Sequence, residues 1–74
     1  EEIFIILSGH VKIRIGDEKE ELFSGDAVMI PEMSIHQMWN MGGKNVKYLC
    51  LGVSREKGGK TIVVSKKIIT RKAG

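Results

Sequence analysis

Few side chains in this sequence can do chemistry: two histidines (His10 and His36), the single Cys50, and carboxylates that include Glu2. Imidazole and carboxylate together bind Fe, Mn, Ni, Cu or Zn, and such a set with open positions suits chemistry on oxygen or enediolates. Two ligands are too few for a tight metal site. The simpler interpretations are a solvated Glu2, a hydrogen-bonded His36 in a loop or core, a surface His10 and a small core residue at Cys50.

No other catalytic arrangement is present in the sequence. The serines lie at turns or strand ends without an elbow motif, and no glycine-rich phosphate loop precedes a helix. No cluster of cysteine and histidine indicates a structural zinc site. Methionines 29, 33, 38 and 41 are interpreted as core packing rather than as soft metal ligands. A lone cysteine excludes an intrachain disulfide and favours a reducing compartment, so we expect a cytoplasmic protein.

Alternating apolar residues, broken by glycine, asparagine and aspartate, predict strands throughout the chain. The predicted strands are residues 3–7, 10–15, 20–23, 27–30, 36–40, 46–53 and 61–70, with a glycine-containing connector at 54–60. Short strands at close spacing predict an all-β sandwich or barrel. Both faces of the strand at residues 3–7 are apolar, so we expect missing chain or a partner subunit to cover the second face.

Because side chains alternate along a strand, residues two positions apart share a face. If Glu2 and His36 face an internal pocket, the alternation predicts which neighbours line it: Phe4 and Ile6 beside Glu2, and Met38 and Asn40 beside His36. Tyr48 and Cys50 are further candidates from a neighbouring strand, whereas Trp39 faces away and is a candidate for packing against a partner. Such a pocket is mostly apolar with one polar corner, which is typical of a small-ligand site.

Two motifs of the sequence resemble those of the cupin superfamily. The first cupin motif is G-x5-H-x-H-x3,4-E-x6-G, and here six residues separate Glu2 from Gly9. The second is G-x5-P-x-G-x2-H-x3-N, which resembles the segment from Gly25 through His36 to Asn40. Met33 stands where the family prefers a glycine, so we expect a different loop path before His36.

The resemblance implies an all-β, cupin-like double-stranded β-helix, that is, a jelly-roll barrel, which we expect to be incomplete at its N-terminus. In cupins three histidines and a glutamate hold a metal inside the barrel. By resemblance, Glu2 is the carboxylate ligand and His36 the third histidine, and the two histidines of the first motif are expected upstream of Glu1. The resemblance thus implies a divalent transition metal, a small-molecule ligand, or both, in the intact protein.

Charge divides the chain into two parts. Residues 1–54 carry a net charge of −3 and residues 55–74 a net charge of +6. We interpret 1–54 as the C-terminal part of a cupin barrel and 55–74 as a basic connector with a terminal strand. A basic segment can bind nucleic acid, but lysines more often protect an edge strand, and no stacking platform accompanies them, so nucleic acid is not expected. No apolar run approaches the roughly 20 residues of a membrane span.

Three functions remain open at this point. The first is a metal-binding cupin, whether or not it is an enzyme. The second is a ligand sensor without catalysis, of the kind that resembles sugar-sensing barrels. The third is a structural barrel without a ligand, which would be favoured by a pocket filled by Phe4, Ile6 and Met38. In each case we expect a homodimer, with exchange of an end strand such as residues 61–70 as one route.

Overall fold

The computed structural model describes residues 1–56 and 59–69. Within these ranges the chain forms only strands and no helix, and therefore no helix that could cross a membrane. The strands are β1 (Glu2–Ser8), β2 (His10–Ile15), β3 (Glu18–Phe23), β4 (Ala27–Ile30), β5 (His36–Asn40), β6 (Val46–Glu56) and β7 (Gly59–Ile69). The predicted all-β class is confirmed.

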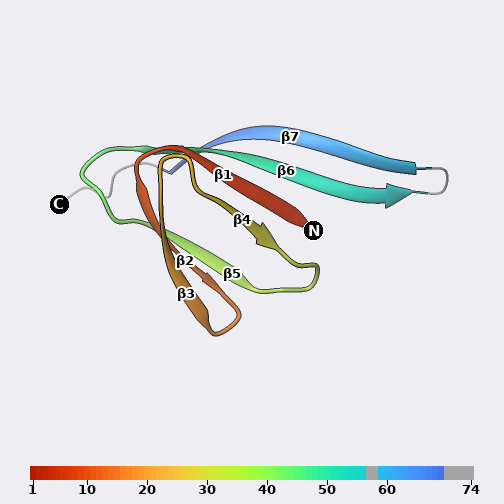
Figure 1. Cartoon of the computed structure of the whole chain (residues 1–74), viewed down its shortest axis with the longest axis horizontal. Helices are drawn as coiled ribbons and strands as arrows, with labels where there is room; N and C mark the ends of the chain where they lie inside the picture. Colours follow the sequence, from red (N-terminus) through yellow and green to blue (C-terminus); the bar gives the residue numbers. More distant parts are fainter. Residues whose placement is uncertain (57–58, 70–74) are drawn as a thin grey trace.

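The strands form two antiparallel sheets, as Figure 1 shows. One sheet has four strands in the order β4-β1-β6-β7, and the other has three in the order β3-β2-β5. Neighbours in the four-stranded sheet come from distant parts of the sequence, since β1 pairs with β4 on one side and with β6 on the other. The β6–β7 hairpin extends beyond the ends of the other strands (Figure 1).

The hydrophobic core lies between the two sheets and is built from alternate residues of the strands. In β2, Val11 and Ile13 are buried, whereas His10, Lys12 and Arg14 lie on the outer face. The other buried core residues come from four strands, β1, β3, β4 and β6: Phe4, Ile6, Leu22, Ile30 and Val46. A core of this size leaves little stability to spare, so local contacts around it matter.

The structure extends several predicted strands. β1 and β3 begin earlier than the apolar pattern indicates, at Glu2 and Glu18, because charged residues continue the backbone pairing. The expected connector at 54–60 is largely strand: β6 continues to Glu56 and β7 begins at Gly59, with register pairs at Ser54–Thr61 and Arg55–Lys60. Thr70, the expected end of the last strand, lies outside the described residues.

Left-handed backbone occurs at four positions in turns of the described residues, Gly9, Gly16, Gly25 and Met33. Gly9, between β1 and β2, has φ of 102°, and a Cβ built on it would lie 2.7 Å from Cγ2 of Val46. Met33, in the β4–β5 loop, has φ of 64° with its side chain fully exposed. Glycine adopts this conformation without steric cost. Met33 therefore has the left-handed conformation that suits glycine. At this residue the loop path expected to differ does not, and only the residue type differs from the motif.

Candidate functional site

Glu2 opens β1 on the inner side of the four-stranded sheet. It pairs with Ile30 of β4 and with Gly52 of β6, and its side chain is half-buried. One carboxylate oxygen, Oε2, accepts a hydrogen bond from the Cys50 thiol at 2.9 Å. Cys50 lies opposite Phe4 in the register of β1 and β6, so Glu2 and Cys50 are diagonal neighbours on one face of the sheet.

This environment keeps two further groups protonated. Burial, followed by the hydrogen bond and the charge of Glu2, raises the pKa of the Cys50 thiol to about 11. Burial also raises the pKa of Tyr48, with smaller contributions from the charges of Cys50 and Glu2. Burial and nearby negative charge both disfavour the ionised form of a thiol or a phenol, so each group keeps its proton to a higher pH. At neutral pH, Cys50 and Tyr48 are therefore uncharged hydrogen-bond donors.

His36 opens β5 in the other sheet, where it pairs with Ile15 of β2. Its imidazole meets the ring of Phe4 edge-on, with ring centroids 5.4 Å apart and an interplanar angle of 72°. The same Phe4 ring contacts Tyr48, with a centroid distance of 5.2 Å. Phe4 therefore contacts a side chain from each sheet, the His36 imidazole of the three-stranded sheet and the Tyr48 phenol of its own sheet.

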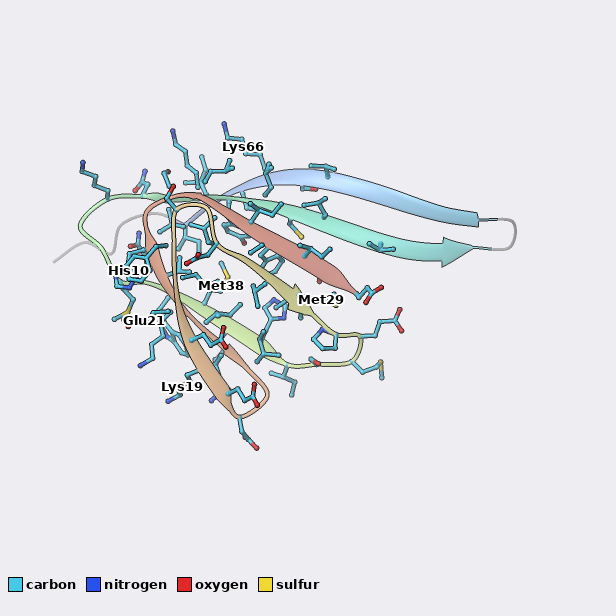
Figure 2. The ribbon with its side chains drawn as sticks, viewed as in Figure 1. His10, Lys19, Glu21, Met29, Met38 and Lys66 are labelled. Carbon is cyan, nitrogen blue, oxygen red and sulfur yellow. The ribbon has the colours of Figure 1, made fainter. Side chains whose placement is uncertain are left out.

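A cavity of about 290 Å³ opens at this aromatic contact, and its lining comes from both sheets. The residues that line it are Phe4, His36, Gln37, Met38, Tyr48 and Ile69. Figure 2 shows the Met38 side chain between the sheets. Among the residues that the structure describes, neither the His36 imidazole nor the Tyr48 hydroxyl has a hydrogen-bond partner, so both are available to a ligand.

The structure gives the other expected site residues different positions. Ile6 is 1% exposed and belongs to the core rather than to the cavity wall. The Asn40 amide donates to the carbonyl oxygens of Lys44 at 2.7 Å and Ile69 at 3.3 Å, and it accepts from the Gly42 amide at 3.0 Å. Asn40 thus ties the β5–β6 turn to β7. Glu2 does not line the cavity, but its charge acts on Tyr48, which does.

Gln37 and Ile69 line the cavity without having been predicted. Alternation assigns Gln37 to the exposed face of β5, where it indeed lies, and it borders the cavity at its rim. Ile69 reaches the cavity because β7 pairs with β6, which places Ile69 opposite Val46. No local pattern in the sequence indicates that long-range pairing.

The described side chains do not fit a metal centre. Within residues 1–53 and 63–69, whose side chains the structure describes, no three histidine, cysteine or acidic side chains gather where they could hold an ion. Glu2 is hydrogen-bonded to Cys50, and His36 packs against Phe4. Together Glu2 and His36 amount to two ligands, fewer than the three protein ligands typical of a catalytic metal.

Two other hollows have similar volumes but a different character. One, of about 240 Å³, lies between β4 and the β2–β3 hairpin, with Ile13, Val28 and the carboxylates of Glu18 and Glu20 in its lining. The other, of about 260 Å³, lies on the outer face of the three-stranded sheet and is lined by Lys12, Lys19, Trp39 and Met41. Neither includes a histidine, so the cavity at His36 is the candidate site.

Comparison with known proteins agrees with this architecture. The family model described as the cupin domain matches residues 1–52. The uncharacterized protein MJ1618 of Methanocaldococcus jannaschii is 38% identical over 50 residues, an alignment that covers 68% of this chain. That alignment covers 40% of the relative, so the chain spans less than half the length of the relative it matches. No solved structure matches the chain. The matched segment contains Glu2 and His36 and runs from β1 into β6, and the chain therefore belongs to the cupin superfamily.

Proposed function

We propose that the cavity at His36 binds a small organic molecule. The observation that carries this proposal is a pair of polar groups that contact the buried Phe4 ring and line the cavity, the His36 imidazole and the Tyr48 hydroxyl, neither of which has a hydrogen-bond partner among the described residues. Apolar walls with a few convergent polar groups are the usual composition of a ligand pocket. Met38 and Phe4 border the cavity without filling it, which argues against a purely structural barrel.

The chemistry of the lining limits the ligand class. Tyr48 stays protonated at neutral pH, and either imidazole nitrogen of His36 can donate or accept. The remaining walls are the apolar side chains of Phe4, Met38 and Ile69. A volume of about 290 Å³ is at the small end of ligand pockets. We therefore propose a ligand with a compact apolar body and one or two hydroxyl or carboxyl groups.

The test is a ligand panel of hexoses and simple aromatic carboxylates such as benzoate and 4-hydroxybenzoate. Binding is measured by thermal shift and confirmed by isothermal titration calorimetry. For a ligand that binds, His36→Ala and Tyr48→Phe should each weaken affinity about 5- to 20-fold, since each removes one hydrogen bond. His10→Ala is the matched control, because His10 lies in the same three-stranded sheet as His36 but on its outer face, away from the cavity. Equal losses in all three variants, or no binder in the panel, would contradict the proposal.

Metal binding by the intact protein is a second candidate. It is favoured by the half-buried positions of Glu2 and His36, which are the first residues of β1 and β5. Because the described side chains do not form a complete centre, this candidate requires ligands from elsewhere in a longer protein. The metals suited to such ligands are Fe, Mn, Ni, Cu and Zn. Metal content measured by mass spectrometry should be near zero in this chain and near stoichiometric in a longer one. Loss of that metal in Glu2→Gln and His36→Ala variants would identify the ligands.

A non-catalytic sensing role follows from the same pocket. A sensor and an enzyme differ in whether the bound molecule is changed, so incubation of a panel ligand with the protein and analysis by nuclear magnetic resonance separates them. We also propose a cytoplasmic location, supported by the free thiol of Cys50. Its test is the cellular distribution of the tagged protein.

A further inference from the structure

The outer face of the three-stranded sheet carries an exposed tryptophan beside basic side chains. Val11, Ile13 and Leu22 are buried against the other sheet, so their neighbours along β2 and β3 face outward. The outward residues form two rows across β3, β2 and β5 in the observed register, Glu21–Lys12–Trp39 and Lys19–Arg14–Gln37. Figure 2 shows Glu21 and Lys19 on the side of β3 that faces away from Met38. Lys12 and Trp39 become neighbours only through the pairing of β2 with β5, which no local pattern in the sequence indicates.

This face is hollowed beside the tryptophan. The hollow has a volume of about 260 Å³, and its lining residues are Lys12, Lys19, Trp39 and Met41. Trp39 is 38% exposed and Met41 is 48% exposed, so both present apolar surface to solvent. The lining shares no residue with the cavity at His36, which lies on the inner side of the same sheet. The hollow is therefore a separate site that combines an aromatic side chain with two ammonium groups.

The positive charge of this face is not neutralised by the described part of the protein. Among the outward residues of β2, β3 and β5, only Glu21 is acidic, and its Oε1 lies 3.3 Å from Nε2 of His10. Within the described residues, Lys12, Arg14 and Lys19 form no ion pair and no side-chain hydrogen bond. The Nε of Arg14 is shielded from solvent and has no hydrogen-bond partner among them. A cluster of unpaired cations raises the local concentration of anions.

Two aromatic groups on this face are open to a planar ligand. No ring and no cation of the described residues contacts the Trp39 indole. The second group is the Phe23 ring, which is 53% exposed and stacks on the His10 imidazole with centroids 4.3 Å apart. Lys12 lies opposite Trp39 in the register and is a diagonal neighbour of Phe23. A basic side chain therefore lies between two aromatic positions.

We propose that the outer face of the three-stranded sheet binds a nucleotide, with the base against Trp39 and the phosphate at Lys12 and Lys19. Every base has a π-face that stacks on an aromatic side chain, and lysine is a common partner of phosphate. A phosphate carries more negative charge than a carboxylate, so it matches a pair of ammonium groups better. The same chemistry occurs in a free nucleotide and in a single strand. The second aromatic group at Phe23 gives the next base of a strand a place to stack.

Trp39 is the single tryptophan of the sequence, so its fluorescence reports directly on this hollow. A stacked base should quench that fluorescence in titrations with adenosine monophosphate and, separately, with an oligoadenylate of about ten nucleotides. An affinity at least about 5-fold higher for the oligoadenylate identifies a single strand as the source, since a second base is then bound. A smaller difference identifies a free nucleotide. Unchanged fluorescence with both probes at millimolar concentration would overturn the proposal.

Variants of the tryptophan test the stacking contact. Their affinities are measured by isothermal titration calorimetry, which does not depend on tryptophan, and circular dichroism verifies the fold of each variant. Trp39→Leu should weaken binding about 5- to 100-fold, the loss of one base–aromatic stack. Trp39→Phe keeps a ring and should retain most of the affinity. Equal affinities of Trp39→Leu and the unchanged chain would overturn the assigned position of the base.

Variants of the lysines test the phosphate contact. Lys12→Ala and Lys19→Ala should each weaken oligoadenylate binding about 3- to 5-fold at physiological salt, and each should reduce the slope of log affinity against log salt concentration by about 0.7. Lys66→Ala is the charge-matched control, because Lys66 lies on β7 of the other sheet. A loss of the same size in Lys66→Ala would indicate unspecific attraction to a basic protein and would overturn the site. His36→Ala should leave nucleotide affinity unchanged, so these results are independent of ligand binding in the cavity at His36.

Discussion

Gly9 offers a test of how the first turn joins the core. Its φ of 102° is a conformation that residues with a Cβ adopt at a cost, and a Cβ there would also overlap Val46. The overlap involves Cγ2 of Val46 at 2.7 Å and its backbone Cα at 3.1 Å. Val46 has no exposed surface, so its side chain has little room to move. Gly25 is the matched control, because its φ is 92° and nothing lies within 4 Å of a Cβ placed on it.

The two costs of Gly9→Ala can therefore be separated. The backbone conformation alone should cost about 1–3 kcal/mol in either variant. Overpacking against Val46 should add about 1–3 kcal/mol in Gly9→Ala only. A domain of this size has a total free energy of unfolding of roughly 4–11 kcal/mol. Gly25→Ala should therefore remain folded, whereas Gly9→Ala should lie near the limit of stability.

The assay is urea unfolding followed by circular dichroism, with thermal melting as a second measurement. Each kcal/mol lowers the melting temperature of so small a domain by about 4–8 °C. In a double-mutant cycle, Val46→Ala should cost about 1 kcal/mol less in the Gly9→Ala background, because it removes the atom at 2.7 Å. Equal free-energy losses for Gly9→Ala and Gly25→Ala, within about 0.5 kcal/mol, would refute the steric reasoning.

Three further predictions concern the β4–β5 loop, the β5–β6 turn and the hydrogen bond between Cys50 and Glu2. Met33→Gly should raise the free energy of unfolding by about 0.5–1 kcal/mol in urea, because the side chain is fully exposed and φ is 64°, whereas Met33→Ala should bring no gain. Asn40→Ala should lower the free energy of unfolding by about 1–3 kcal/mol, since three hydrogen bonds are lost. It should leave the affinity of the His36 cavity for its ligand nearly unchanged. Cys50, with a pKa raised to about 11, should react slowly with iodoacetamide at pH 8. Glu2→Gln should lower that pKa and speed the reaction, which intact-mass measurements will follow. Because the pKa of Cys50 is higher in the folded chain than in the unfolded chain, protonated Cys50 contributes to the free energy of unfolding. This contribution is fully present below pH 9 and is lost as the pH rises from 9 toward 11.

The strands were predictable from the sequence because alternation is a local signal. The strands at residues 10–15, 27–30 and 36–40 have the bounds that the pattern predicts. The extension of β6 and β7 toward residues 57 and 58 was not predictable in the same way, since Lys60 and Arg55 carry no apolar periodicity and are held by pairing between the two strands. The order of strands in each sheet depends on contacts between distant segments, which no single window of sequence contains.

The candidate site was predictable only in part, for the same reason. Alternation places Phe4 and Met38 correctly on the inner faces of their strands, and both border the cavity. It also places Asn40 on the inner face, yet the Asn40 amide is used in the turn because the chain reverses immediately after it. The thiol–carboxylate hydrogen bond between Cys50 and Glu2 depends on the register of β1 and β6, so a shift by one residue would have separated the two groups.

Both faces of β1 carry apolar side chains, and this strand lies at the centre of the ligand site. β1 lies between β4 and β6, and its inner face carries Glu2 and Phe4, whereas its outer face carries Ile3 and Ile5. The same strand positions the Phe4 ring against His36 and Tyr48. The strand that carries Ile3 and Ile5 on its outer face is therefore also the strand that positions the ligand-binding groups.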